Sequence, residues 1–273
     1  MMYDFSVIVC GCTKNSASYI EENITKLYEM NNIFKAFHFV VYENDSNDNT
    51  KDKLQHFKNS HSNFNYISER DVDKHIDLDR RLQLRPQFIA HGRNVLLKYM
   101  NEKYTEFDYM IMVDLDSVIS TFRASQLKYI FNNDLTWDVL TANCIGKYYD
   151  IWALRIYKDV WVPEIHNTLW STYIDYDCWE KAIMCRNAQK YVYDNQITIP
   201  VNKPLIPVSS SFGGFGIYKM SKIKGCFYKA VVDNKIYCEH VSFHNDIKNI
   251  HNAKIFICPQ FVVNQQNEHV RNS

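Results

Sequence analysis

Glycine is scarce in this sequence, and the nucleotide-binding motifs that depend on it are missing. Only seven glycines occur in 273 residues. No Gly-x-Gly-x-x-Gly follows the first apolar segment, and no Walker A sequence is present. Both motifs need glycine because the backbone must approach a phosphate closely. Their absence argues against a dinucleotide-dependent dehydrogenase and against a P-loop protein.

The sequence also lacks an excess of charge and a long apolar run. Lys and Arg together number 31, and so do Asp and Glu. This balance gives no global field that would attract nucleic acid or an anionic membrane surface. No stretch approaches the roughly 18 apolar residues of a membrane span, and the N-terminus lacks the basic and apolar regions of a signal peptide. We therefore expect a soluble, cytoplasmic protein with no transmembrane segment and no nucleic-acid partner.

The eight cysteines show no metal-binding spacing. No Cys-x2-Cys pair occurs among them, which argues against a zinc ribbon. Without a secretory signal, we expect buried free thiols rather than disulfides.

The most informative stretch is an apolar run that ends in two carboxylates. Residues 109–113 are Tyr-Met-Ile-Met-Val, and Asp114-Leu115-Asp116 follows. Such a run is typical of a strand buried on both faces. Residues i and i+2 of a strand point the same way, so both carboxylates could face one divalent cation. The alternative is an acidic turn in which Asp116 caps the next helix.

Apolar and helical segments alternate through the first half of the chain. We expect strands near 5–12, 36–42, 63–68, 109–113 and 137–141, and helices near 17–30, 50–57, 86–100 and 122–131. This alternation predicts an α/β fold with a parallel, doubly wound sheet. We expect one continuous domain, with a nucleotide-binding half at about 1–145, an acceptor and catalytic half at about 146–260, and a polar tail at 261–273.

Four further motifs lie outside the central strand. The second strand ends in a turn of polar and acidic residues at 43–50, and residues 148–155 are rich in aromatic side chains. Three of the seven glycines fall at 213–216, where the backbone could approach a ligand or turn with positive φ. Glu239, His240 and His244 form a late cluster.

The order of these motifs resembles the GT-A class of nucleotide-sugar glycosyltransferases. The turn at 43–50 is similar to the Asp-Asp-Gly-Ser-Thr-Asp-Gly-Thr turn of the large family 2 group, and 113–117 match the Asp-x-Asp motif. Residues 148–155, 212–214 and 238–241 look closest to the capsule-associated α-1,3-mannosyltransferases of fungi and to related enzymes of microbes and large viruses. The resemblance covers about 5–250. It implies a Rossmann-like, mostly parallel sheet with a smaller acceptor-side subdomain, and it allows a virus-infected host cell as the setting.

The resemblance also assigns roles to individual residues. It implies that a UDP- or GDP-sugar donor is contacted from five places in the chain. These are the loop after the first strand (Thr13 and Lys14), the end of the second strand (Glu43), the helix before Asp-x-Asp (Arg93), that motif (Asp114) and the glycine loop (Gly213 and Gly214). Asp116 would bind Mn²⁺ or Mg²⁺, with Asp114 nearby and His244 completing the metal site. One imidazole among oxygen ligands suits Mn²⁺ better than Ca²⁺.

The late motif departs from the family pattern, in which Glu-Asp is common in inverting enzymes. Here Glu239 is followed by His240, so either residue could be the catalytic base that acts on a glycan acceptor. A retaining mechanism, which needs no such base, is also open. Two other functions remain: a catalytically silent nucleotide-sugar or glycan-binding protein on the same fold, and a metal-dependent phosphoesterase that uses the Asp pair.

Overall fold

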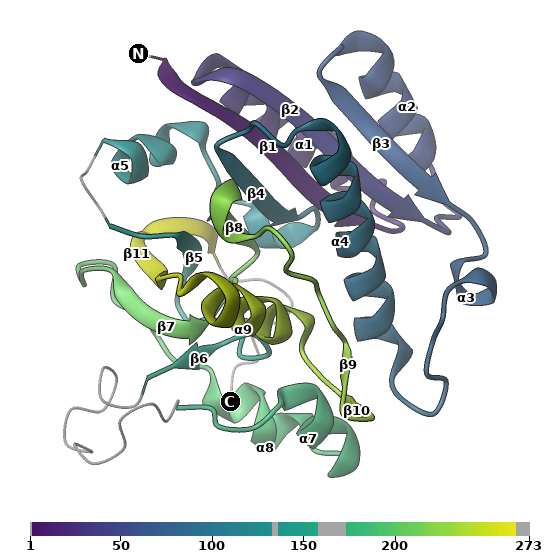
Figure 1. Ribbon diagram of the computed structural model, residues 1–273, viewed down its shortest axis with the longest axis vertical. Coiled ribbons are helices and arrows are strands. Elements are labelled where there is room, and N and C mark those ends of the chain that lie inside the picture. The colour runs from purple at the N-terminus through teal and green to yellow at the C-terminus, as the bar shows by residue number, and fades with distance from the viewer. Residues whose placement is uncertain (1, 133–135, 158–172, 266–273) are drawn as a thin grey trace.

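The computed structural model describes residues 2–132, 136–157 and 173–265, and they form an α/β architecture (Figure 1). The strands of the central sheet are β1 (Tyr3–Thr13), β2 (Phe34–Asn44), β3 (Phe64–Glu69), β4 (Tyr109–Asp114), β5 (Val139–Ile145), β6 (Arg155–Ile156), β7 (Ile206–Ser210), β8 (Phe215–Lys219) and β11 (Ile255–Gln265). The α-helices are α1 (Ile20–Tyr28), α2 (Thr50–Ser60), α3 (Val72–His75), α4 (Leu84–Lys103), α5 (Leu127–Phe131), α7 (Cys178–Met184), α8 (Ala188–Tyr191) and α9 (Glu239–His251).

The strands are hydrogen-bonded in the order β3-β2-β1-β4-β8-β5-β11-β7-β6. Within the described part of the chain, only β7 and β8 run against the direction of the other strands of this sheet. The sheet is therefore mostly parallel, as predicted. A separate two-stranded ribbon joins β9 (Val231–Val232) to β10 (Lys235–Ile236).

Helices cover both faces of the sheet. Right-handed crossovers place α1 and α2 on one face and α4 on the other, because the chain reverses its direction across the sheet after β3. In Figure 1, α4 and α9 lie on the near side of the strands. The interior of β1 shows why the sheet holds together, since residues 7–10 are completely buried. Four such side chains exclude water from the middle of the molecule.

The predicted strands and helices of the first half are confirmed, with small changes at their ends. The expected helix at 122–131 is shorter, because a 3₁₀ turn at Ala124–Gln126 precedes α5. The charged segment at 69–81 contains only the short α3. The predicted tail needs a correction: β11 continues to Gln265 and pairs with β5. Residues 266–273 lie outside the described residues.

The expectation of free thiols is confirmed for all eight cysteines. Six of them are buried, and burial raises the pKa of the Cys144, Cys226 and Cys258 thiols to about 11. These thiols are therefore protonated packing groups at neutral pH. Among the described residues, no helix combines the length and the apolar character needed to cross a membrane.

Candidate functional site

A cleft of about 930 Å³ opens where β1, β2 and β4 end. Ligands of open α/β sheets bind at this edge. Residues from both halves of the chain line it, including most of the predicted site: Thr13, Lys14, Arg93, Asp114, Asp116, Glu239 and His240. The structure thus brings together residues that are more than two hundred positions apart in the sequence.

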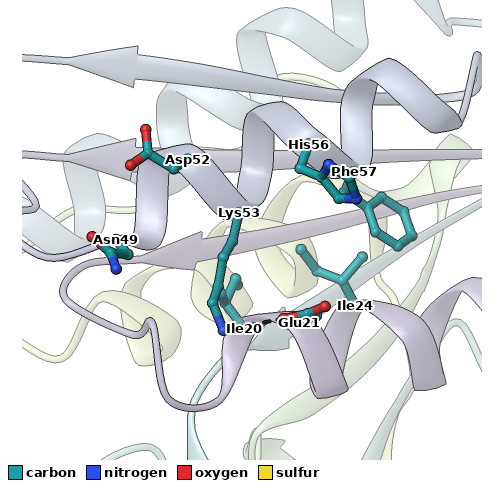
Figure 2. Close-up of a pocket in the computed structure, with 8 residues that line it drawn as sticks. All are labelled: Ile20, Glu21, Ile24, Asn49, Asp52, Lys53, His56 and Phe57. Carbon is teal, nitrogen blue, oxygen red and sulfur yellow. Dashed lines mark ion pairs between the residues drawn. The ribbon is translucent and has the colours of Figure 1, made fainter.

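A second, smaller hollow lies between α1 and α2 (Figure 2). Its volume is about 280 Å³, and an ion pair of 3.1 Å between Lys53 Nζ and Glu21 Oε2 crosses it. Ile20 and Ile24 form its apolar floor and already belong to the core. None of the predicted site residues lines this hollow, so the larger cleft is the candidate site.

Arg93 is the central cation of the cleft. Its guanidinium forms ion pairs with Asp114 Oδ1, at 2.9 Å, and with Glu239 Oε1. It also lies 5.1 Å from the ring centre of Phe212 and 5.6 Å from that of Tyr228. Burial opposes its charge, but the two carboxylates outweigh burial and raise the pKa of Arg93. Arg93 therefore remains charged and fixes both acidic groups.

Close packing of α4 on β2 places Arg93 there. Gly92 has no side chain, and a Cβ at this position would lie 2.6 Å from the ring of Tyr42. A larger residue would push the helix away from the sheet, since real Cβ contacts are never this short. Gly92 thus determines how near the next residue, Arg93, comes to the end of β4.

Asp114 and Asp116 lie at the end of β4, as predicted. The Asp114 carboxyl is about one-third exposed, with 33% of its side-chain surface accessible. Burial raises its pKa, Arg93 lowers it, and Asp116, Asp150 and Glu239 raise it further. Asp116 also accepts a hydrogen bond of 3.1 Å from the backbone N–H of Val118. Asp116 therefore caps the 3₁₀ turn at Ser117–Ile119, and this cap leaves its second carboxylate oxygen outside that bond.

Asp150 is a site residue that was not predicted. It is buried in the wall of the cleft, where Oδ2 accepts from the N–H of Gly213 at 3.0 Å and Oδ1 from that of Ala153 at 3.3 Å. Burial raises the pKa of Asp150 to about 7; the Gly213 N–H lowers it, and Glu239 raises it. The signal in the sequence was one acidic residue within the aromatic segment 148–155.

Gly213 and Gly214 lie behind the cleft rather than in its lining. Their φ angles are +66° and +83°, which favour glycine. Gly213 N–H binds Asp150, and the carbonyl of Gly214 accepts from the N–H of Asp114 at 3.0 Å. The expectation that these glycines contact the donor is not supported. They position the two acidic residues instead.

Glu43 is also outside the cleft lining. Its side chain is completely buried, and it accepts from the N–H of Ser46 at 2.7 Å and from Ser68 Oγ at 2.5 Å. The turn that it stabilises then holds the loop after β1: Ser46 Oγ accepts from Asn15 N–H at 2.9 Å. Glu43 thus supports the loop that carries Lys14, and the structure does not support a direct donor contact.

His244 is buried on α9 and does not line the cleft. Its Nδ1 is 2.9 Å from Ser210 Oγ, and its Nε2 is 3.1 Å from Tyr218 Oη. Burial lowers the pKa of His244 to about 3. Because both ring nitrogens have partners, the structure does not support the prediction that His244 binds a metal.

His240, one helical turn earlier, has a different environment. Its ring stacks on Phe212 with centroids 3.8 Å apart, and it lines the cleft. Neither ring nitrogen has a hydrogen-bond partner among the described residues. Burial lowers the pKa of His240, so the ring is neutral. A buried polar group without a partner costs about 1–3 kcal/mol, and a bound ligand could satisfy it.

The acidic residues of the cleft fit a divalent cation that arrives with a diphosphate. No group of three or more His, Cys, Asp or Glu in the described part of the chain could hold a metal by itself. Mg²⁺ and similar ions, however, use one or two carboxylates and take their other ligands from phosphate and water. Repulsion by Asp116, Asp150 and Glu239 helps to raise the pKa of Asp114, and a cation would relieve it.

No family model matches this sequence, and no curated protein matches it. Solved structures do resemble it. One is the mannosyltransferase PcManGT from Pyrobaculum calidifontis in complex with GDP-Man and Mn²⁺, at 16% identity and a TM-score of 0.51, over 96% of this chain and 57% of that one. Another is residues 1–349 of S. aureus TarS with UDP-GlcNAc, at 15% identity and a TM-score of 0.51, over 96% of this chain and 59% of that one. The chain spans less than two thirds of either protein, and its fold is that of GT-A glycosyltransferases.

Proposed function

We propose that this protein is a metal-dependent glycosyltransferase. It would transfer a sugar from a UDP- or GDP-sugar to a hydroxyl group of a glycan acceptor. The observation that carries the proposal is the position of Asp114 and Asp116. They lie in the cleft at the end of β4, beside the cation Arg93 and on the fold of nucleotide-sugar enzymes.

The donor diphosphate would lie between the loop after β1 and the end of β4. Lys14 is exposed at the rim of this cleft, where its ammonium group can approach phosphate oxygens. Thr13 and Ser16 line the same end. The turn at 43–50 fixes this loop, because Thr50 Oγ1 accepts from Ser16 N–H at 2.8 Å. A fixed loop loses little entropy when the donor binds.

Asp116, with Asp114 nearby, would hold Mn²⁺ or Mg²⁺. Such an ion stabilises the negative charge that develops on a diphosphate leaving group. Arg93 would keep Asp114 oriented and would add positive charge behind it. The side chain of Asn23 fixes the backbone of the motif, since it donates to the carbonyl of Asp116 at 2.7 Å.

Glu239 and His240 begin α9 at the cleft, and we propose that one of them takes the proton of the acceptor hydroxyl in an inverting reaction. Glu239 is held by Arg93, whereas the nitrogens of His240 have no hydrogen-bond partner among the described residues and Nε2 lies 3.9 Å from Glu239 Oε1. A general base must reach the reacting hydroxyl. Substitution of each residue in turn distinguishes the base from its neighbour.

The proposal is tested by incubating the protein with a panel of UDP- and GDP-sugars and measuring sugar release. The resemblance to α-1,3-mannosyltransferases places GDP-mannose first in the panel. We expect release with Mn²⁺ that stops when EDTA is added. A donor that binds but releases no sugar under any condition would instead indicate a silent binding protein.

A further inference from the structure

Two tryptophans form an aromatic wall at one end of the cleft. The ring centres of Trp152 and Trp179 are 4.2 Å apart, and the ring planes meet at 30°. Both side chains are half-buried, pack against the core and line the cleft. Buried aromatic pairs are common in cores, but a pair that keeps accessible surface inside a concave site is available to a ligand.

The turn that carries Trp152 is held in place by buried charged side chains. Asp150 Oδ1 accepts from the N–H of Ala153 and closes the turn. Arg155 Nη1 donates to the carbonyl of Leu154 at 2.7 Å and is 3.3 Å from that of Trp152. With its backbone carbonyl fixed in this way, Trp152 has little freedom to move away from the cleft.

Trp179 is positioned by a cap at the start of α7. Asp177 Oδ1 accepts from the N–H of Trp179 at 2.9 Å, and Oδ2 accepts from the N–H of Cys238 at 2.8 Å. Asp177 Oδ2 also lies 3.7 Å from Arg155 Nη2. One buried carboxylate therefore connects the turn of Trp152, the first turn of α7 and the residue that precedes Glu239. The aromatic wall and the start of α9 form one rigid unit.

Asp150 supplies the polar part of the same end of the cleft. It lies two residues before Trp152, and each of its oxygens accepts one backbone N–H. A carboxylate oxygen can accept more than one hydrogen bond. Asp150 has no ion-pair partner within 4.0 Å among the described residues, in contrast to Glu239. It can therefore accept hydrogen bonds from the hydroxyl groups of a ligand.

We propose that Trp152, Trp179 and Asp150 form a subsite that binds a pyranose ring of the glycan acceptor. The C–H face of the ring would lie on the tryptophans, and its hydroxyl groups would donate to Asp150. The inference rests on the proposed function, because it assigns the acceptor side of that site. An apolar wall with a few placed polar groups is the usual composition of a small-molecule pocket.

The position of the wall favours a sugar over a nucleobase. Trp152 precedes β6, at the opposite edge of the sheet from β3 and β2. The loops that would hold the nucleotide follow β1 and β2, and α7 lies well away from them in Figure 1.

The test is a titration of the protein with the methyl α- and β-pyranosides of glucose, galactose and mannose. Binding is monitored by the change in tryptophan fluorescence. The titration is carried out with and without Mn²⁺ and UDP or GDP. We expect a saturable change for at least one pyranoside. Trp152→Ala and Trp179→Ala should each weaken its binding tenfold or more, and Asp150→Asn should weaken it severalfold. Trp137→Phe is the control, because Trp137 is buried in the core and outside the cleft lining.

Binding of UDP and GDP should change by less than twofold in both tryptophan variants, and circular dichroism should show that they fold. Loss of nucleotide binding instead of pyranoside binding would assign the wall to a nucleobase and overturn the inference. A wild-type protein that responds to none of the six pyranosides would also overturn it. Pyranoside binding without release of sugar from any donor would leave the subsite standing and contradict the proposed glycosyltransferase activity.

Discussion

Arg93 and Glu239 form a buried ion pair although 146 positions separate them in the sequence. Arg93 comes from α4 in the first half of the chain, and Glu239 begins α9 in the second. The same guanidinium binds Asp114 at the end of β4. This pair joins the first half of the chain to the second at the cleft, so we expect a change in either residue to disturb both sides of the cleft.

Replacing Arg93 by Met should destabilise the protein strongly. The change leaves the two carboxylates without their cation, and breaking a buried pair in this way costs about 3–5 kcal/mol. Urea unfolding measures the free energy of unfolding. Lys98→Met, on the exposed side of the same helix, is the matched control and should change little. Equal stability of the Arg93 variant and the wild type would show that the ion pair contributes little to the folded state.

Glu239→Gln should lower kcat more than it weakens donor binding if Glu239 takes the acceptor proton, because an amide cannot act as a base. The measurement combines steady-state turnover with calorimetric titration of the donor. Glu102→Gln, an exposed change at the end of α4, is the control. A loss confined to donor affinity would assign Glu239 to the positioning of Arg93.

His240→Phe tests the other candidate base. The ring of His240 stacks on Phe212 and has no hydrogen-bond partner in the part of the chain that the structure describes. Phenylalanine should therefore keep the packing and remove a buried polar group. We expect unchanged or higher stability and, if His240 takes the acceptor proton, a turnover reduced by about a hundredfold or more, the usual size of general-base effects. Full activity of this variant would show that His240 is only a packing residue.

Asp150 should make stability depend on pH. Burial raises its pKa from 3.8 to about 7 in the folded protein. Between these values the folded state keeps the proton that the unfolded state has released, so the free energy of unfolding falls as pH rises. Asp150→Asn removes this pH dependence. The free energy of unfolding of the variant, relative to that of the wild type, should therefore rise from pH 4 to pH 7. Asp52→Asn, on the exposed face of α2, should give a curve parallel to that of the wild type. A parallel curve for Asp150→Asn would contradict the prediction.

The sequence predicted the sheet and the Asp-x-Asp site because both depend on local patterns. The apolar run at 109–113 is typical of a buried strand, and the structure shows that strand as β4. The end of a parallel strand is where ligands bind. The place of Asp114 and Asp116 at the cleft follows from the end of this strand. The resemblance predicted a donor contact for Arg93, and its ion pair with Asp114 was not predicted.

Glu43 and His244 do not line the cleft, because each binds partners that are distant in the sequence. Nothing near Glu43 indicates that Ser68 of the next strand binds its carboxylate, and nothing near His244 indicates that Tyr218 and Ser210 enclose its ring. Asp150 was missed for the same reason, since the Gly213 N–H that holds it lies 63 positions away. Local pattern gives the strand ends, whereas tertiary packing decides which polar side chains face the cleft.

We propose that Asp116 holds a divalent cation together with the donor diphosphate. Calorimetric titration of UDP and GDP into wild-type protein and into Asp116→Ala, with Mn²⁺ and with EDTA, tests it most directly. We predict that Mn²⁺ strengthens nucleotide binding at least tenfold in the wild type, and that this gain disappears in the variant while Asp52→Asn retains it. An equal gain from Mn²⁺ in Asp116→Ala and the wild type would contradict the assignment of the metal site.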